Sequence, residues 1–379
     1  MKFVIDSKEF KNVTERASIV CSKKGLFCLT SLFIIADKEN QLITVKATNM
    51  DSFAEVYTDY AKVYESGKFY VELENLKRLY NVSGEITVES TENSVKVRSN
   101  KKQSEVPTNS SDEIEFPSVK HIGCFSADKE EMLDTFSKLS CCLSTSDAKK
   151  IMTGFNIRNN HIAACDGYRV AMRDVEWNFA NGLNITIPGY VCKELSKVSA
   201  NKREENIKVF CDDKNKFVRF VGFDFAYTTR LLEGVFFDVD TVMNFGDYPT
   251  YSFDVKADSL FAISKEYHAL LKNIQGVMYI FHINGKFVAV AMSPSYKTSD
   301  IVETENENNV PDNLRYAFNP RLINGVAGIF GKQTITIESV LNKGFTGWKF
   351  KGENGYSALV LPVRPQDDLS DVENFAASA

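Results

Sequence analysis

A glycine-rich segment near the C-terminus contains residue types that cradle phosphate groups in other proteins. In Gly328-Ile-Phe-Gly331-Lys332, two glycines and a lysine lie close together. A phosphate-binding loop needs four residues between its first glycine and its Gly-Lys pair, and position 326, where that glycine would stand, is Val. Because glycine also ends helices, we interpret the segment as a helix-end turn before a strand.

Paired carboxylates are the second candidate for chemistry, since two nearby acids can act as a general acid and a general base. The pairs Asp212/Asp213 and Asp367/Asp368 both lie in polar, turn-like sequence, where solvated acids are the simpler interpretation. The chain also lacks the G-x-S-x-G, H-E-x-x-H and dinucleotide-binding patterns. The sequence therefore indicates no catalytic group, and we predict that the protein is not an enzyme.

Cysteine and histidine are the third candidates, because they are common metal ligands. The cysteines form no C-x-x-C pair, and the histidines are dispersed along the chain. We interpret the cysteines as reduced thiols that mostly fill the core, and we predict no metal site and no cofactor. The residues are Cys21, Cys28, Cys124, Cys141, Cys142, Cys165, Cys192 and Cys211, with His121, His161, His268 and His282.

The composition is that of an ordered globular protein of two or three domains. Of the 379 residues, 44% are hydrophobic and 25% are charged, and no stretch approaches the length of an apolar membrane span. The N-terminal MKFVIDSKEF shows no apolar signal region, so we expect a cytoplasmic protein that does not contact membranes. A net charge of −5 argues against binding nucleic acid through bulk charge, but it allows basic residues to be concentrated on one surface.

Basic residues accompany the apolar stripe of each predicted helix, and this recurrence is the main electrostatic signal. The residues are Lys11, Arg16, Lys77, Arg78, Lys138, Lys193, Lys197, Lys265, Lys272 and Arg321. Acidic residues such as Glu15 and Glu194 are interleaved with them, so ordinary solvated helix faces explain any single helix equally well. Six helices on one surface would, however, concentrate their positive charge there.

The elements that position these residues recur along the chain. A strand and short helix over 69–79 precede the alternating strands 85–89 and 94–98. The same order returns with 185–195 before 207–210 and 217–220, and with 316–323 before 334–337 and 347–350. A second unit, a strand followed by an amphipathic helix, starts near residues 2, 124 and 252.

These repeats predict an α+β fold of three similar domains, each with two helices packed on antiparallel sheets. We place the domains at 1–122, 123–250 and 251–365, where polar runs separate the repeats. Residues 366–379 form an acidic tail that we expect to be disordered, because it has little apolar content.

Several short motifs, in this order and spacing, resemble the bacterial sliding clamp, the β subunit of the replicative DNA polymerase. The resemblance covers residues 1–365, and its most specific part is the Asp166-Gly-Tyr-Arg169 run. The other motifs are the Met1-Lys-Phe3 start, Glu115-Phe-Pro117, Thr153-Gly-Phe155, Leu231-Leu-Glu-Gly234, Phe237-Asp238 and the terminal Ala358-Leu-Val-Leu-Pro-Val-Arg364.

The resemblance implies a ring of two chains in which helices line a hole for duplex DNA and sheets form the outside. The ring performs no chemistry but tethers the replicative polymerase, the clamp loader and other replication and repair factors. The DNA-contacting residues implied by the resemblance and the helix pattern are Lys23, Lys24, Lys77, Arg78, Lys149, Lys150, Lys193 and Lys197, although exposed lysines are also common in ordinary loops. Val106, Leu270 and Leu271 match the positions of the family's dimer interface.

The family also binds short peptides with a glutamine and apolar anchors in a cleft between its second and third domains. The matching residues are Met152, Cys165, Gly167, Tyr168, Arg169, Val170, Val242, Leu359, Val360, Leu361, Pro362, Val363 and Arg364. Their types suit an apolar pocket in which Gly167 admits a backbone and Arg169 and Arg364 donate to peptide carbonyls. Ordinary core is the alternative for the valines and leucines. Phe237 and Thr241 depart from the family's usual residues, which leaves the peptide preference open.

Two other hypotheses are compatible with the repeats: an enzyme on the same scaffold, which would need convergent acid and base residues, and a structural protein that never meets DNA. The tail contains Gln366-x-x-Leu369-x-x-Val372, which has the spacing of cleft-binding peptides. The tether to Arg364 is too short for docking within one chain, which leaves docking into another ring or screening of the cleft. We expect truncation after Pro365 to raise peptide affinity modestly and to reduce the association of rings.

Overall fold

The computed structural model of the chain describes residues 1–80, 82–108, 115–117, 119, 122–158, 160–212, 216–274, 276–293, 295–312, 314–341, 347–364 and 369–378. Of the residues discussed above, His121, Asp213, Pro365, Gln366, Asp367 and Asp368 lie outside the described residues.

The chain packs into two compact units, each built from segments that are distant in the sequence. Unit 1 contains Met1–Leu133 and Trp177–Glu233, and unit 2 contains Asp134–Glu176 and Gly234–Ala379. Strand pairing across the predicted domain boundaries explains this division. In unit 1, β4 (Ser52–Thr58) pairs with β17 (Phe225–Arg230), and in unit 2, β13 (Arg169–Asp174) pairs with β26 (Tyr356–Val360). The three domain boundaries stay a prediction.

Unit 1 contains two antiparallel sheets. The first has the order β5-β1-β7-β8-β9, with strands β5 (Ala61–Glu65), β1 (Lys2–Asp6), β7 (Glu85–Ser90), β8 (Ser94–Arg98) and β9 (Gln103–Pro107). The second has the order β10-β15-β16-β17-β4-β3-β2-β6, with β10 (Ile122–Asp128), β15 (Asn206–Cys211), β16 (Phe217–Val221), β3 (Leu42–Thr48), β2 (Ser31–Asp37) and β6 (Gly67–Glu72). Strand β14 (Asn184–Pro188) precedes the last helix of this unit.

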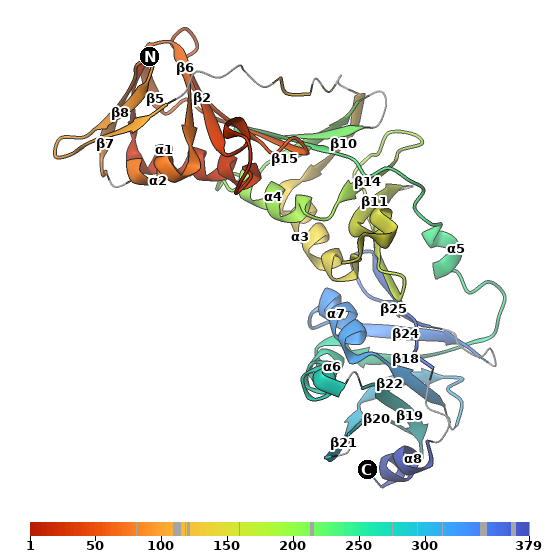
Figure 1. Cartoon of the computed structure of the whole chain (residues 1–379). Coiled ribbons are helices and arrows are strands. Elements are labelled where there is room, and N and C mark those ends of the chain that lie inside the picture. The colour runs from red at the N-terminus through yellow and green to blue at the C-terminus, as the bar shows by residue number, and fades with distance from the viewer. Residues whose placement is uncertain are drawn as a thin grey trace. The chain divides into compact units, whose positions relative to one another are not determined.

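Three helices of unit 1 form a connected row. Helices α1 (Ser7–Ala17) and α2 (Leu73–Leu79) lie side by side beneath the first sheet (Figure 1), and the Thr14 and Tyr80 hydroxyls hydrogen-bond at 2.8 Å. Helix α4 (Val191–Val198) joins α1 on the other side, because Arg16 Nε donates to Val198 O. Helix α3 (Lys129–Leu139) begins in this unit. The short 3₁₀ turns η1 (Ser18–Val20) and η2 (Phe27–Leu29) follow α1.

Unit 2 also contains two antiparallel layers. Within it the first runs β11-β12-β13-β26-β25-β24-β18-β22, with β11 (Gly154–Arg158), β12 (His161–Cys165), β25 (Trp348–Lys351), β24 (Thr334–Val340), β18 (Thr250–Lys256) and β22 (Thr304–Asn308). The second is β21-β20-β19-β23, with β21 (Tyr296–Val302), β20 (Lys286–Ser293), β19 (Met278–Ile283) and β23 (Arg315–Phe318). The remaining elements are α5 (Val239–Met243) and the turns η3 (Ser140–Cys142), η4 (Asp147–Thr153) and η5 (Lys272–Ile274).

Helices α6 (Ala257–Leu271) and α7 (Pro320–Phe330) pack against each other in unit 2 (Figure 1). Helix α7 starts at Pro320 after an Asn319 side-chain cap, as helix N-termini favour. It ends at Gly331, whose φ of +63° lies in the left-handed region that glycine adopts at low cost. The interpretation of Gly328 to Lys332 as a helix-end turn is therefore confirmed.

The predicted repeat of strands and helices is confirmed, with α1, α2, α3, α4, α6 and α7 at the expected places. The expectation of a disordered tail is wrong for its second half. Residues Ser370–Ala377 form helix α8, in which Val372 and Ala376 are buried against β19 and β20. Val372 and Ala376 lie on one face of this helix at a spacing of four, and the acids Asp371 and Glu373 lie outside that face.

The state of the cysteines and the lengths of the helices can be compared with the expectations from the sequence. All eight cysteines are thiols rather than halves of disulfides, and Cys124, Cys142, Cys165 and Cys211 are buried. No helix in the described part of the chain has the length and apolar character needed to cross a membrane.

A buried ion pair holds the row of helices to the second sheet of unit 1. Arg16, 2% exposed, donates to both carboxylate oxygens of Asp224 at 2.8 and 2.7 Å. Burial raises the pKa of Asp224, but the hydrogen bonds and charge of Arg16 outweigh it, so the pKa lies below its usual value. Arg16 therefore does not face solvent with the other basic residues of the helices.

We predict that Asp224→Asn destabilises the protein by about 3 kcal/mol at neutral pH, because it leaves the Arg16 guanidinium buried without its counter-charge. An acid with a lowered pKa in the fold stabilises it above the unfolded pKa, and this contribution disappears as pH falls through the folded pKa. Urea unfolding at a series of pH values should show the difference from wild type shrinking below about pH 4. A difference that is constant over this range would contradict the assignment.

Candidate functional site

Residues from four separate stretches of unit 2 surround one apolar pocket of about 290 Å³. Turn η4 and the end of β12 provide one side, β13 and its preceding turn the next, and β26 the third, while α5 and the loop before it close the rim. The lining residues are Lys149, Met152, Cys165, Gly167, Tyr168, Arg169, Val170, Phe237, Val242, Leu359 and Leu361.

Strand register brings the two most distant stretches together. Val170 lies opposite Cys165 on β12 and opposite Leu359 on β26. Beyond β26, the Leu361 N–H donates to Tyr168 O at 2.9 Å, which keeps Leu361 beside the turn before β13. These pairings explain why residues nearly two hundred positions apart line the same pocket.

The turn before β13 has a conformation that only a few residue types adopt easily. Asp166 Oδ1 accepts the N–H groups of Tyr168 and Arg169, which is the bonding of an Asx turn. Gly167 has a φ of +90°, and a Cβ at this position would meet no atom within 4 Å. The pocket is therefore open beside Gly167, as the sequence predicts, and the backbone there is accessible to a ligand.

The side chain of Arg169 forms hydrogen bonds within the protein. Its side chain turns into the protein, where Nε donates to Asp166 at 3.0 Å and Nη1 donates to Leu322 O at 3.2 Å. Nη2 donates to the carbonyl of Cys141. Gly325 makes this possible, because a Cβ there would lie 2.3 Å from Nη1. The guanidinium is thus engaged within the chain while Arg169 also lines the pocket, and its role as a donor to peptide carbonyls stays a prediction.

The floor of the pocket is a hydrophobic cluster. Its buried members are Ala163, Cys165, Val170, Met172, Phe236, Val239, Met243 and Leu359, and Ile151, Met152, Phe237 and Phe245 pack against them. Burial raises the pKa of the Cys165 thiol to about 11, so this side chain is neutral near pH 7. At the rim, Tyr168 is 65% exposed and Leu361 is 41% exposed. The arrangement suits an apolar side chain inserted beside a rim tyrosine.

Nine of the thirteen predicted cleft residues line this pocket, and four do not. Val360 points into the core, and Val363 packs against the other face of the unit, in a cluster with Tyr279 and Val372. Pro362 is half-buried and Arg364 is exposed outside the lining. Alternation along an extended chain explains why Leu359 and Leu361 reach the pocket while the valines between and after them do not.

Lys149 and Phe237 also line the pocket: nothing in the sequence indicated Lys149 there, whereas Phe237 is one of the two departures from the family's pattern expected at the rim. Lys149, predicted to contact DNA, has the non-helical angles φ −128° and ψ 79° inside η4, and its exposed side chain lines the pocket. Phe237 stacks on Phe236 with ring centroids 4.8 Å apart. The residue type at position 237 differs from the one usual in the family, and this difference marked Phe237 as a rim residue.

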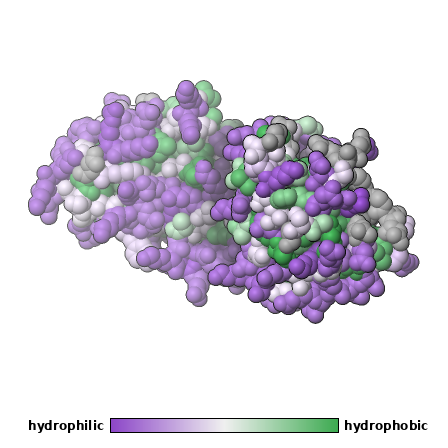
Figure 2. Space-filling view, turned by 90° about the horizontal axis from the view of Figure 1, so that it is seen from below, coloured by the Kyte–Doolittle hydropathy of each residue, from purple (hydrophilic) through white to green (hydrophobic). Residues whose placement is uncertain are grey.

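All eight side chains predicted to contact DNA are exposed. None of them forms an ion pair with a described acidic side chain. In unit 1, Lys77 and Arg78 end α2, while Lys193 and Lys197 lie on α4, and α1 bonds to both helices. Hydrophilic residues cover most of the face shown in Figure 2. Basic groups of neighbouring helices are therefore available for phosphate contacts in this unit.

Comparisons with known proteins identify the architecture. Residues 127–238 match the family model described as the central domain of the DNA polymerase III beta subunit. The beta subunit of Streptococcus pyogenes superposes with a TM-score of 0.85 at 17% identity, covering 96% of this chain and 100% of that one. The chain has the fold of a DNA sliding clamp.

Other solved clamps give the same result. The Bacillus subtilis sliding clamp matches with a TM-score of 0.84 at 16% identity, covering 97% of this chain and 100% of that one. The Bartonella birtlesii sliding clamp, crystallised bound to griselimycin, matches with a TM-score of 0.84 at 17% identity, covering 96% and 100%. Comparison with the curated proteins gives no match. The predicted α+β clamp fold and the resemblance to this family are confirmed.

The predicted dimer residues of this clamp fold lie in different environments. Leu270 is 40% exposed at the end of α6, next to Ile274, which is also exposed. Leu271 and Val106 are buried within their own units, at 1% and 4% exposure. Leu271 fills the space beside Gly276, where a Cβ would lie 2.8 Å from it. Of the two leucines, only Leu270 has a side chain available to another molecule, because successive helical positions point in different directions.

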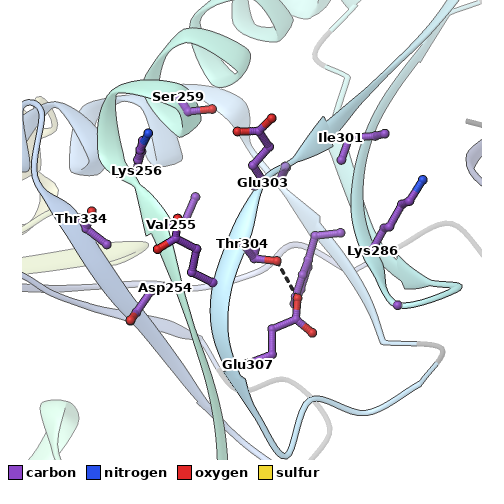
Figure 3. A pocket seen from close by; sticks show the side chains of 14 residues that line it. Asp254, Val255, Lys256, Ser259, Lys286, Ile301, Glu303, Thr304, Glu307 and Thr334 are labelled. Atoms are coloured by element: carbon purple, nitrogen blue, oxygen red, sulfur yellow. Dashed lines mark hydrogen bonds between the residues drawn. The ribbon is translucent and has the colours of Figure 1, made fainter.

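A second pocket of unit 2, about 430 Å³, lies between β18, β22 and the β19–β20 turn (Figure 3). It is lined by four acidic residues, Asp254, Glu303, Glu305 and Glu307, and by the two lysines Lys256 and Lys286. Asp254 accepts from the side chains of Asn306 and Thr336, and Glu307 accepts from Thr304 at 2.5 Å. The pocket is thus polar and carries an excess of carboxylates. Among the described residues, no three His, Cys, Asp or Glu side chains are arranged to hold a metal ion.

Proposed function

We propose that this protein is a DNA sliding clamp that encircles duplex DNA as a head-to-tail homodimer. The observation that supports this most is the agreement of 96% of the chain with solved clamps, together with a DNA polymerase III beta central domain at residues 127–238. In this role the protein is an accessory factor of replication, and it tethers the polymerase, the loader and other factors without catalysing a reaction. It would act where replicating DNA is found, in the cytoplasm.

The charge distribution suits a ring that slides. Lysines that contact only phosphates bind DNA without regard to base sequence. Their binding releases counterions from the DNA, and because this release is less favourable at high salt concentration, the contacts weaken as salt is added. A net charge of −5 on the whole chain discourages binding of DNA to other surfaces. Residence on DNA would then depend on topology rather than on the strength of these contacts.

We predict that the loaded protein remains on closed circular DNA at salt concentrations that abolish ordinary phosphate binding, and that it leaves when the circle is cut. Retention measured by gel filtration before and after linearisation tests this. A variant with Lys77, Arg78, Lys193 and Lys197 changed to Ala is the control, since it should lose salt-sensitive DNA binding but keep retention on circles. Equal loss from circular and linear DNA would overturn the proposal.

Two unpaired sheet edges support the head-to-tail dimer. Strand β9 ends the sheet of unit 1, and strand β21 ends a sheet of unit 2, so each has one edge without a strand neighbour among the described residues. Exposed edges tend to pair with another chain.

We predict that Leu270→Glu combined with Ile274→Glu yields folded monomers, because both side chains are exposed near the α6 end and would place charge in an apolar contact. Sedimentation velocity over a dilution series measures the dimer. Ala262→Glu adds charge at another exposed position of α6 and should leave the dimer unchanged. Dimers of undiminished strength in the double variant would place the interface elsewhere.

The apolar pocket is the proposed site for partner peptides. A Leu361→Ala change removes about 0.8 kcal/mol per methylene that a ligand buries, which corresponds to a several-fold loss of affinity. Calorimetry with a polymerase-derived peptide, or with griselimycin, measures this effect. Leu26→Ala, at an exposed leucine of unit 1, is the matched control and should not alter binding. Equal affinities for the wild type and Leu361→Ala would move the site.

A further inference from the structure

Helix α8 covers an apolar face of the β21-β20-β19-β23 sheet. Tyr279, Phe281, Val288, Val290 and Ala317 form this face, and Val372 and Ala376 of α8 are buried against it. Leu369 and Phe375 pack at its margin. Figure 1 shows α8 beside β19 at the C-terminal end of the chain. The apolar residues of the tail are thus occupied within the chain.

An ion pair fixes the direction in which α8 lies on the sheet. The Glu373 carboxylate contacts the guanidinium of Arg315, the first residue of β23. Glu373 is in the first turn of α8, where a negative charge also interacts favourably with the helix dipole. The helix is therefore held by two kinds of interaction, one apolar and one electrostatic.

Residues 361–363, which follow β26, contribute both to the apolar pocket and to the cluster on which α8 packs. Leu361 lines the pocket, and two residues later Val363 packs in the cluster with Leu369, Val372 and Phe375. Backbone hydrogen bonds hold Leu361 and Val363 to the rest of the unit. Leu361 N–H donates to Tyr168 O at 2.9 Å, and Val363 N–H donates to Ala317 O at 2.8 Å.

We propose that docking of α8 positions Leu361 as a wall of the partner pocket, so that the tail acts as a positioning element for partner binding. This inference rests on the proposed function of the pocket. Val363 loses apolar neighbours when α8 leaves, and its bond to Ala317 O then lies at a hydrated surface. Leu361, two residues away, would spend less time in the geometry that lines the pocket, which reduces the apparent affinity by the fraction of competent molecules.

The direction in which ligand affinity changes when the tail is removed distinguishes this proposal from the hypothesis of a tail that screens the pocket. A loose acidic tail would obstruct the pocket, and its removal would raise affinity. A docked helix that supports the pocket wall has the opposite effect, because its removal frees the wall. The composition of the tail is the same in both cases, so only a measurement on docked and undocked forms distinguishes them.

The test compares full-length Val372→Asp with Asn374→Asp. Both substitutions add one negative charge to α8, but Val372 is buried against the sheet and Asn374 is exposed. We expect the first to bind griselimycin or a polymerase-derived peptide roughly three- to tenfold more weakly, and the second to bind as wild type does. Hydrogen exchange of the Leu361 and Val363 amides should accelerate only in Val372→Asp.

A second variant, truncated after Arg364, removes α8 without adding charge and should match Val372→Asp in both measurements. Protected amides in α6 show that the unit remains folded. Unchanged affinity and unchanged exchange at Leu361, with fast exchange in α8 itself, would overturn the proposal, as would tighter binding after truncation. If no form binds either ligand, the proposed function of the pocket fails, while the exchange data still decide whether α8 holds Leu361.

Discussion

The antiparallel pairing of β13 with β26 is the interaction on which unit 2 and its pocket depend. It places Arg169 opposite Val360 and Val170 opposite Leu359. From this register follow the bond between Leu361 and Tyr168, the joint apolar floor and the position of the rim. A slip by one residue would turn Leu359 and Leu361 away from the pocket and bring Val360 into it, because side chains alternate along a strand. The pocket is therefore a consequence of register as much as of residue type.

Arginine shows how the same residue type serves opposite purposes in this chain. Arg16 and Arg169 are buried, and each donates several hydrogen bonds to groups brought together by folding. Such arginines join elements of the fold, because a buried guanidinium is stable only when hydrogen-bonded and charge-compensated within the protein. Arg78 and the exposed lysines, by contrast, lie on the solvent side of short helices. Burial, rather than position in the sequence, therefore decides whether a basic side chain joins elements of the fold or faces solvent.

Much of the fold could be predicted from the sequence, because periodicity is a local property. The strand, helix and hairpin order over 69–98 recurs twice, and each copy forms as expected. Pairing between strands far apart in the chain is not local, so the division into two units, which depends on β4 with β17 and on β13 with β26, could not be derived from it. The direction in which a side chain points also depends on contacts between distant segments, so local periodicity does not predict it. Arg169 was expected to face a peptide and Leu271 to face a partner chain, yet both side chains are buried.

The tail shows why composition is a weak guide for short segments. The tail carries four acids and few large apolar side chains, yet Leu369, Val372 and Ala376 are spaced so that a helix presents them to one side. A helix of this length is marginal by itself, and packing on the face formed by Tyr279 and Phe281 supplies the missing stability. That face needs a cover in turn, because its aromatic and aliphatic side chains would otherwise be exposed to water. Helix α8 is therefore stable because it packs on the sheet face, and the face is shielded from water because α8 covers it. Neither feature can be predicted from its own segment of the sequence alone.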